Sequence, residues 1–315
     1  MPALRASRHN PRMVKQFPLV GAHVSSAGGP QKVFPKAREM GLEAIQLFIS
    51  APQQWRAPNV SDEQIEAFLS AKSEFDVPLF FHGVYLINFG SADEAILDKS
   101  VASLAAYLRW AGRLGVRGTI FHVGSHLGAG FEAVLPQMCA RIRRALDEAQ
   151  NDSWLILENN AGQGNCCGRS FAELGALIRG LDGEPRVRVC LDTCHAFAMG
   201  YDIATPEGCA AAMDEFQREV GLDRLVAVHA NDSKTPLSGI RDRHENIGDG
   251  HIGYDGFRAV MAHPAFAGIP FLLEVPGMDK KGPDAENVNR LKRIRDELAS
   301  PGAKRTPRKR TPAKQ

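Results

Sequence analysis

Long apolar runs are missing from this 315-residue sequence, and no stretch approaches the roughly 18 residues that a membrane-spanning helix needs. The first residues also lack the apolar segment of a secretory signal peptide. Cysteine is scarce: the six present form no C-x-x-C pair and are too few for a disulfide framework in a chain of this length. We therefore expect no membrane association and a reducing, cytoplasmic location.

Acidic residues are absent from both ends of the chain. Residues 1–16 hold four Lys and Arg, and residues 300–315 hold six. We interpret the first segment as a basic extension and the second as a disordered basic tail, because it is Pro-rich and has no apolar periodicity. The remaining body carries 28 Lys and Arg against 36 Asp and Glu. An acidic body needs positive charge to accept an anionic ligand, and bound divalent cations or the basic ends are two sources.

The body alternates short apolar segments with longer amphipathic ones, such as 61–75 and 99–115. Each apolar segment favours β structure, as a buried parallel strand does. The eight segments are 17–24, 44–49, 78–82, 118–122, 154–158, 187–192, 225–229 and 270–274. Eight strands alternating with helices predict one α/β domain over 17–299, a (β/α)8 TIM barrel, with a doubly wound open sheet as the alternative. Ser61 and Gln64 resemble a capping box at a helix start.

Potential metal ligands end six of these eight strands. They are His82, His122, Glu158, Asp192, His229 and Glu274. In a parallel barrel all strand carboxyl ends point to the same face, so these side chains should converge. Three more candidates lie in short local pairs, with His195 three residues after Asp192, and His244 two residues after Asp242. Histidine and carboxylate without thiolate suit zinc, and manganese or iron less cleanly. Nine ligands exceed what one ion needs and indicate two or three metals.

Several stretches resemble the endonuclease IV family over nearly the whole body. They are GAHVSSAGG (21–29), YLINFGS (85–91), HVGSH (122–126), ENNAGQGN (158–165), LDTCHAFAMGYD (191–202), HANDSK (229–234) and DRHENIGDGHIG (242–253). The resemblance implies a TIM barrel with three zinc ions per chain. One ion would be held by His82, His122 and Glu158. Glu158 would bridge to a second, also held by Asp192, His229 and Glu274, and the third would be held by His195, Asp242 and His244.

The same resemblance implies a zinc-dependent DNA repair endonuclease. It would hydrolyse the phosphodiester 5′ to abasic sites, leaving a 3′-hydroxyl and a 5′-deoxyribose phosphate, and would also trim blocked 3′ ends. Metal-bound hydroxide would attack phosphorus at the three-zinc centre. Glu158 and Glu274 are the expected catalytic carboxylates, the latter orienting or deprotonating the nucleophile. The partner would be damaged double-stranded DNA in the nucleoid, and a monomer would suffice.

DNA contacts are expected from two loops. Tyr85 and Leu86 stand in the family's wedge position, and Arg56 lies in the loop 50–58. This sequence has Gln53 where well-known members have an inserting Arg, and Gln supplies neither the charge nor the planar fork. Two further departures are Val123 in place of Pro and Gly83-Val84 in place of Ala-Pro.

Two other functions compete with the nuclease. A metal-dependent sugar isomerase or epimerase shares the barrel but needs one or two metals rather than nine ligands. A non-catalytic DNA-binding protein would explain the basic ends but not the retained ligands. Metal stoichiometry separates the first from the nuclease, and strand scission of a baseless duplex separates the second.

Deleting residues 300–315 is expected to weaken DNA binding at moderate salt, because six positive charges no longer meet phosphates. The dissociation constant should also depend less steeply on salt, while bound metal per chain stays unchanged. Anisotropy titrations at several salt concentrations, with elemental analysis, measure both quantities. An unaltered salt slope would show that this tail contributes nothing to binding.

Overall fold

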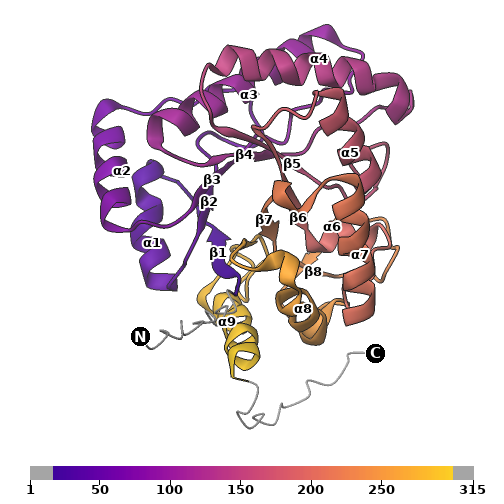
Figure 1. The fold of residues 1–315 in the computed structure, drawn as a ribbon. Coiled ribbons are helices and arrows are strands. Elements are labelled where there is room, and N and C mark those ends of the chain that lie inside the picture. The colour runs from indigo at the N-terminus through magenta and orange to yellow at the C-terminus, as the bar shows by residue number, and fades with distance from the viewer. Residues whose placement is uncertain (1–16, 301–315) are drawn as a thin grey trace, which may run out of the picture.

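Eight parallel strands close into a barrel in the computed structural model, which describes residues 17–300. Figure 1 shows the ring of strands enclosed by helices. The strands are β1 (Leu19–His23), β2 (Ile45–Leu47), β3 (Leu79–His82), β4 (Gly118–Phe121), β5 (Trp154–Glu158), β6 (Val187–Asp192), β7 (Leu225–His229) and β10 (Pro270–Leu273). Strand β1 pairs with both β2 and β10, which closes the ring and confirms the predicted (β/α)8 barrel. The predicted basic ends lie outside the described residues, apart from Ser300.

Helices follow the strands, and all except the short, buried α6 (Thr193–Ala198), which carries His195 to the barrel mouth, cover the outside of the barrel. They are α1 (Val33–Met40), α2 (Asp62–Glu74), α3 (Glu94–Leu114), α4 (Phe131–Ala149), α5 (Phe171–Gly180), α6, α7 (Pro206–Glu219), α8 (Gly253–Ala262) and α9 (Ala285–Ala299). Helix α2 begins with the predicted capping box, in which the Ser61 hydroxyl accepts from the Gln64 N–H and the Gln64 side chain accepts from the Ser61 N–H. None of the helices among residues 17–300 is both long and apolar enough to cross a membrane.

A layer of apolar side chains fills the interior of the barrel below its mouth. Its members are Ala44, Phe80, Ile120, Ile156, Cys190, Ala227 and Leu272, all fully buried. Side chains alternate between the two faces of a strand, so the residue two positions further along also points inward. For the last six members that residue is His82, His122, Glu158, Asp192, His229 and Glu274, respectively. The barrel thus supports each predicted strand-end ligand on an apolar floor, although His122 and Glu274 lie one residue beyond their strands.

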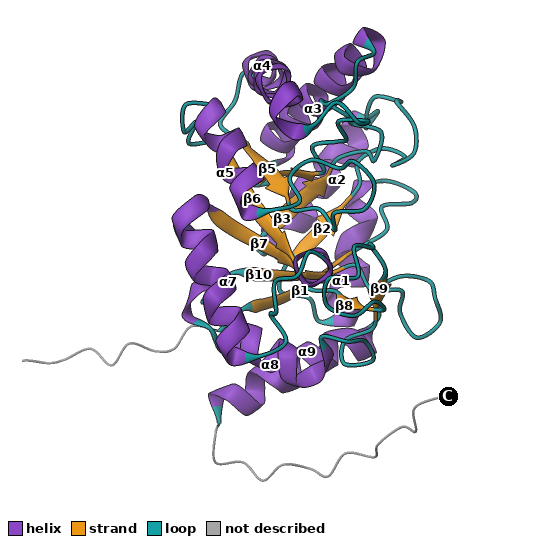
Figure 2. Cartoon of the chain, turned by 90° about the vertical axis from the view of Figure 1, so that its right-hand side faces the viewer, coloured by secondary structure: helices purple, strands orange, loops and turns teal. Residues whose placement is uncertain are grey.

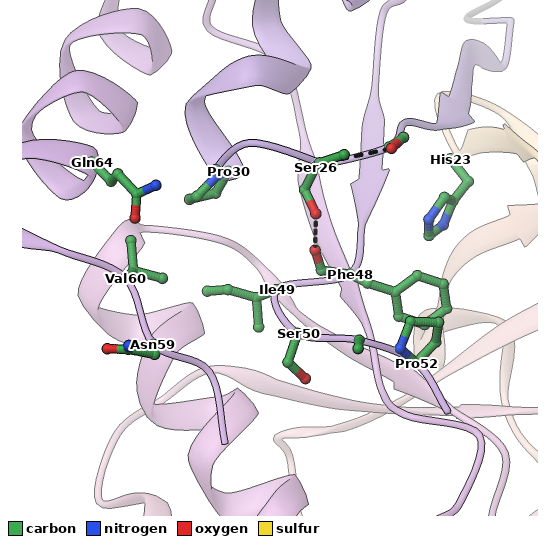
Figure 3. Close-up of a pocket in the computed structure, with 14 residues that line it drawn as sticks. His23, Ser26, Pro30, Phe48, Ile49, Ser50, Pro52, Asn59, Val60 and Gln64 are labelled. Carbon is green, nitrogen blue, oxygen red and sulfur yellow. Dashed lines mark hydrogen bonds between the residues drawn. The ribbon is translucent and has the colours of Figure 1, made fainter. Parts of the chain in front are cut away.

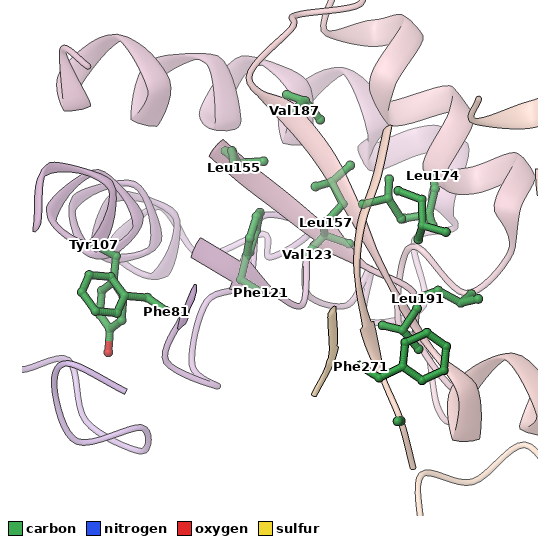
Figure 4. Close-up of a cluster of buried hydrophobic side chains, with 14 of the residues drawn as sticks. Phe81, Tyr107, Phe121, Val123, Leu155, Leu157, Leu174, Val187, Leu191 and Phe271 are labelled. Carbon is green, nitrogen blue, oxygen red and sulfur yellow. The ribbon is translucent and has the colours of Figure 1, made fainter. Parts of the chain in front are cut away.

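The outward-facing residues of the strands form the larger core, between barrel and helices. Phe81 of β3 packs edge-on against Tyr107 of α3, with ring centroids 6.2 Å apart, and both are fully buried. Figure 4 shows these rings with Phe121, Leu155 and other strand residues that face the helical layer. Burial on both faces explains why the strands are continuous apolar segments rather than alternating ones.

The loops after the strand carboxyl ends include a hairpin that the sequence analysis did not predict. Strand β8 (Asp232–Ser233) pairs antiparallel with β9 (His244–Glu245). The buried Asp232 carboxylate accepts backbone N–H groups of Gly248, Gly250, Ile252 and Gly253, and so holds the loop that follows β9. Figure 2 shows β8 and β9 at the end of the barrel where the longer loops gather. The hairpin returns His244 to the barrel mouth.

Replacing Ile156 by alanine is expected to lower the free energy of unfolding by about 2–5 kcal/mol, because it empties part of a fully enclosed apolar layer. Denaturant unfolding followed by circular dichroism measures the change. Leu69→Ala on helix α2 is the control, since Leu69 is 42% exposed and its loss should stay within about 0.5 kcal/mol. Equal losses for the two variants would contradict a packed barrel interior.

Candidate metal centre

The carboxylate of Glu158 lies at the centre of the barrel mouth and is fully buried. Its Oε1 atom is 2.9 Å from His229 Nδ1 and 3.6 Å from His195 Nδ1. Its Oε2 atom is 3.2 Å from His82 Nε2 and 3.5 Å from His122 Nε2. Each oxygen therefore faces a different pair of imidazoles, which is the arrangement required of a carboxylate that bridges two ions.

The nine residues selected from the sequence fall into overlapping groups. Within each group the donor atoms lie within 4.8 Å of one another. One group is His82, His122 and Glu158, and a second is Glu158, Asp192, His229 and Glu274. The remaining three residues are His195, Asp242 and His244. The Oδ1 atom of Asp242 is 3.3 Å from His195 Nε2 and 3.2 Å from His244 Nε2. The structure thus brings all nine together, with Glu158 shared between two groups.

Cys194, to which the sequence analysis gave no role, also approaches this centre. Its donor atom groups with those of Asp242 and His244 within 4.8 Å. Burial raises the pKa of the Cys194 thiol to about 12, which opposes ionisation of the sulfur. Cys194 is nevertheless a tenth potential donor beside the nine residues selected from the sequence.

The centre has a closed floor and a more open rim. Five of the nine residues are almost fully buried: His82, Glu158, Asp192, His195 and His229. The other four are partly exposed, with Asp242 at 38% and His122 at 25%. A ligand from solvent therefore reaches the centre from the side of these two residues.

Neighbouring charges in the centre shift the pKa values of its ligands. Burial opposes a charge on His195, but Asp192 and Asp242 outweigh that effect and raise its pKa to about 10. Burial likewise opposes ionisation of Glu158, and the imidazoles of His122 and His229 still hold its pKa well below the usual range. The acidic groups thus create a site in which positive charge is strongly favoured.

Several imidazole nitrogens of the centre have no hydrogen-bond partner within the described part of the chain. Two of them, His195 Nε2 and His244 Nε2, are buried and face the Asp242 carboxylate. A buried polar atom without a partner is costly, and most find one. These nitrogens, beside four carboxylates, fit metal ions of the borderline type that imidazole and carboxylate prefer.

Amide side chains around the ligands were missed by the sequence analysis. Asn231 donates to Asp192 Oδ2 at 2.7 Å, and its oxygen accepts the Glu274 backbone N–H at 2.9 Å. The backbone oxygen of Asn159 lies 2.8 Å from His195 Nδ1, which fixes the orientation of that ring. Both asparagines lie within two residues of a ligand in the ENN and HAND stretches, and that proximity was the available signal.

The residues expected to contact DNA occupy two neighbouring loops. Tyr85, which follows β3, is 54% exposed, and its ring lies 5.5 Å from that of His82. Its backbone N–H donates to Pro52 of the loop after β2, which joins the two loops. Leu86 is only partly buried against the core, and Gln53 and Arg56 are exposed. The structure therefore brings Tyr85 to the centre and leaves Gln53 and Arg56 on the loop beside it.

A cavity of about 570 Å³ opens between the loops that follow β1 and β2 (Figure 3). His23 and Phe48 form its wall on the side of the metal centre, with their rings 4.6 Å apart. Burial lowers the pKa of His23 to about 4, so this imidazole is neutral. Among the described residues that line the cavity there is no Asp, Glu, Lys or Arg, which suits an uncharged group rather than a phosphate.

Exposed large apolar side chains gather around the mouth. Among the described residues five of the six, Tyr85, Leu127, Leu237, Ile240 and Met278, lie on loops after strand carboxyl ends, and the sixth, Leu69, lies apart on helix α2. Leu127 and Ile240 have φ of 50°, which is uncommon for residues other than glycine. Such features cluster where a loop is shaped for contact.

Comparison with known proteins agrees with this geometry. Residues 34–299 match the family described as xylose isomerase-like TIM barrel. The chain is 43% identical to "probable endonuclease 4" of Streptomyces avermitilis, over 88% of this chain and 90% of that protein. It is 37% identical to the corresponding protein of Aquifex aeolicus, over 88% and 97%.

Solved structures give the same result. Endonuclease IV from Thermus thermophilus is similar with a TM-score of 0.79 and 35% identity, over 89% of this chain and all of that one. A D-tagatose 3-epimerase-like protein has a TM-score of 0.66 over 89% and 96% of the two chains, but at 17% identity it shares the fold alone. The chain therefore belongs to the endonuclease IV family, deoxyribonucleases built on the xylose isomerase-like TIM barrel.

Proposed function

We propose that this protein hydrolyses the phosphodiester 5′ to abasic sites in duplex DNA, leaving a 3′-hydroxyl and a 5′-deoxyribose phosphate. The observation that carries the proposal is the convergence of nine His, Asp and Glu side chains on Glu158 at the barrel mouth. The same centre would trim blocked 3′ ends, because that reaction also cleaves a phosphodiester next to a damaged sugar.

Three zinc ions per chain would be held by the donor groups described above. The four carboxylates of the set carry four negative charges when ionised, and three divalent cations exceed that charge by two. An excess of positive charge is what an anionic phosphodiester requires. Zinc in such a site supplies a hydroxide nucleophile at neutral pH and neutralises phosphate charge.

The protein groups divide the remaining work by position. Glu158 fixes four imidazoles at once from the closed floor, and its own burial keeps it from reaching the substrate. Glu274 on the rim has its backbone held by Asn231, and its Oε2 atom lies 3.4 Å from His229 Nδ1. We assign Glu274 to orienting the attacking water. Asp242 and His244 lie on the other side of Asp192, where the departing 3′ oxygen would be stabilised.

Selectivity for abasic sites would come from the loops. A nucleotide without a base loses its stacking and leaves the duplex at low energetic cost. Apolar wedges fill such gaps between base steps in other proteins that deform DNA. Tyr85 is exposed beside His82, and Leu127, Leu237, Ile240 and Met278 are further exposed apolar side chains on loops after strand carboxyl ends. The monomeric state and the nucleoid location remain predictions.

Replacing Glu158 by glutamine is expected to abolish cleavage of a synthetic abasic duplex and to lower bound zinc by more than one ion per chain. The reason is that one carboxylate serves two donor groups. Elemental analysis and a gel assay for scission measure the two quantities. About three zinc per wild-type chain would support the nuclease, whereas one or two manganese or cobalt ions would favour the isomerase alternative.

The matched control is Glu43→Gln. The Glu43 carboxylate pairs with Arg295 and accepts the Val20 N–H at the opposite end of the barrel. Its loss should lower stability while leaving zinc content and cleavage unchanged. Full activity of the Glu158→Gln protein would refute the bridging role.

Replacing Gln53 by arginine is expected to tighten binding to an abasic duplex, if the loop after β2 enters the DNA. The added guanidinium would stack and pair with phosphates in ways that an amide does not. Gln54→Arg is the control, because Gln54 is the exposed neighbour and its substitution adds the same charge. Anisotropy titrations of abasic and intact duplexes compare the two. If both variants gain the same affinity for the abasic duplex, the added charge attracts DNA in general and the position of Gln53 has no special role.

A further inference from the structure

Gln46 is a fully buried polar residue in the middle of strand β2. The strand is otherwise apolar, and Ala44, two residues earlier, belongs to the layer that fills the barrel. The side chain of Gln46 therefore points into the barrel at the level of the metal centre. It is not one of the nine donors, and the sequence analysis gave it no role.

The amide of Gln46 contacts two of the proposed zinc ligands. Its Nε2 atom donates to Glu274 Oε1 at 2.5 Å, and its Oε1 atom accepts from His229 Nε2 at 2.8 Å. The second N–H is directed at His23 Nδ1, 3.1 Å away. Both N–H groups and the carbonyl oxygen are thus in use, so the amide is fully satisfied inside the barrel.

These contacts admit only one orientation of the amide. A flipped amide would place its oxygen against the Glu274 carboxylate and its NH2 group against the N–H of His229. In this orientation the Gln46 oxygen accepts the Nε2 proton of His229, so Nδ1 is the nitrogen left to hold a metal ion. That atom faces Glu158 Oε1 at 2.9 Å and Glu274 Oε2 at 3.4 Å.

We propose that Gln46 is a positioning residue of the metal centre: its single amide selects the metal-binding tautomer of His229 and the rotamer of Glu274 together. The inference rests on the proposed function, since it assigns His229 and Glu274 to the same ion. Outer hydrogen bonds of this kind orient metal ligands, and losing one typically costs about 10–100-fold in metal affinity or activity. His23 supports Gln46 by accepting its remaining N–H.

The primary test is Gln46→Met, which keeps the length and approximate shape of the side chain but removes all three hydrogen bonds. Zinc affinity is measured by equilibrium competition with a chelator, and cleavage by steady-state kinetics on an abasic duplex. We expect one class of bound zinc to weaken by about 10–100-fold. The value of kcat should fall while KM changes little, because Gln46 is fully buried and does not reach DNA.

Asn151→Leu is the matched control for the loss of an internal amide. Its side chain bonds the backbone of Leu108, Ala149 and Ser153 near the start of β5, at the end of that strand remote from Glu158. The control should lower the unfolding midpoint without changing zinc affinity. If Gln46→Met lowers the midpoint as much but binds all its zinc with wild-type affinity, Gln46 serves packing alone and the inference is overturned.

Gln46→Glu provides a second variant in case the methionine protein does not fold. It keeps an acceptor for His229 Nε2 but turns a carboxylate oxygen toward Glu274, so like charges face each other where an N–H bond stood. We expect weaker zinc binding here too, and wild-type binding would contradict the positioning role. Wild-type protein that binds zinc but does not cut an abasic duplex would instead overturn the proposed function, while the zinc affinities of the variants would still test the role of Gln46.

Discussion

Burial of the Glu158 carboxylate among four imidazoles is the constraint on which the rest of this molecule depends. An ionised carboxylate without solvent is costly unless charges or hydrogen bonds compensate it. The barrel places Glu158 where β5 ends, with two histidines at each oxygen. Three further carboxylates surround the same imidazoles, so the centre holds more negative charge than its own protons balance at neutral pH. In the proposed function divalent cations would resolve that imbalance, and an excess of positive charge would then attract phosphate.

The architecture explains how one chain assembles such a centre from residues that are far apart in the sequence. A parallel barrel turns every strand carboxyl end to the same face, and the alternation of side chains sets which residues look inward. An apolar residue inside the barrel followed by a ligand two positions later recurs in six strands, from Phe80 with His82 to Leu272 with Glu274. The hydrophobic layer therefore serves as a floor that also excludes water beneath the ligands.

These rules account for what the sequence could predict. Strand ends and the i, i+3 spacing of Asp192 and His195 are local signals, and together with the family resemblance they found the nine candidate ligands that meet around Glu158. The hairpin β8–β9 was not predicted, since its strands have two residues each and the loop after β9 is held by hydrogen bonds to Asp232. The roles of Gln46 and Asn231 depend on what stands opposite in space, which no local pattern contains.

Some of the residues at which this chain differs from the family pattern lie in the packed scaffold, and one lies on an exposed loop. Val123 and Val84 are buried in the core, and the Gly83 N–H donates to the Ile120 carbonyl oxygen at 2.7 Å, so these positions affect packing beside the ligands His82 and His122. Gln53 stands on an exposed loop and, among the described residues, is not one of the groups that meet around the ligands. Since strands and buried amides fix the chemistry, a loop residue is free to change how DNA is held without altering the metal centre. Under the proposed function, a substitution at Gln53 would therefore change DNA binding and leave the nine candidate ligands in place.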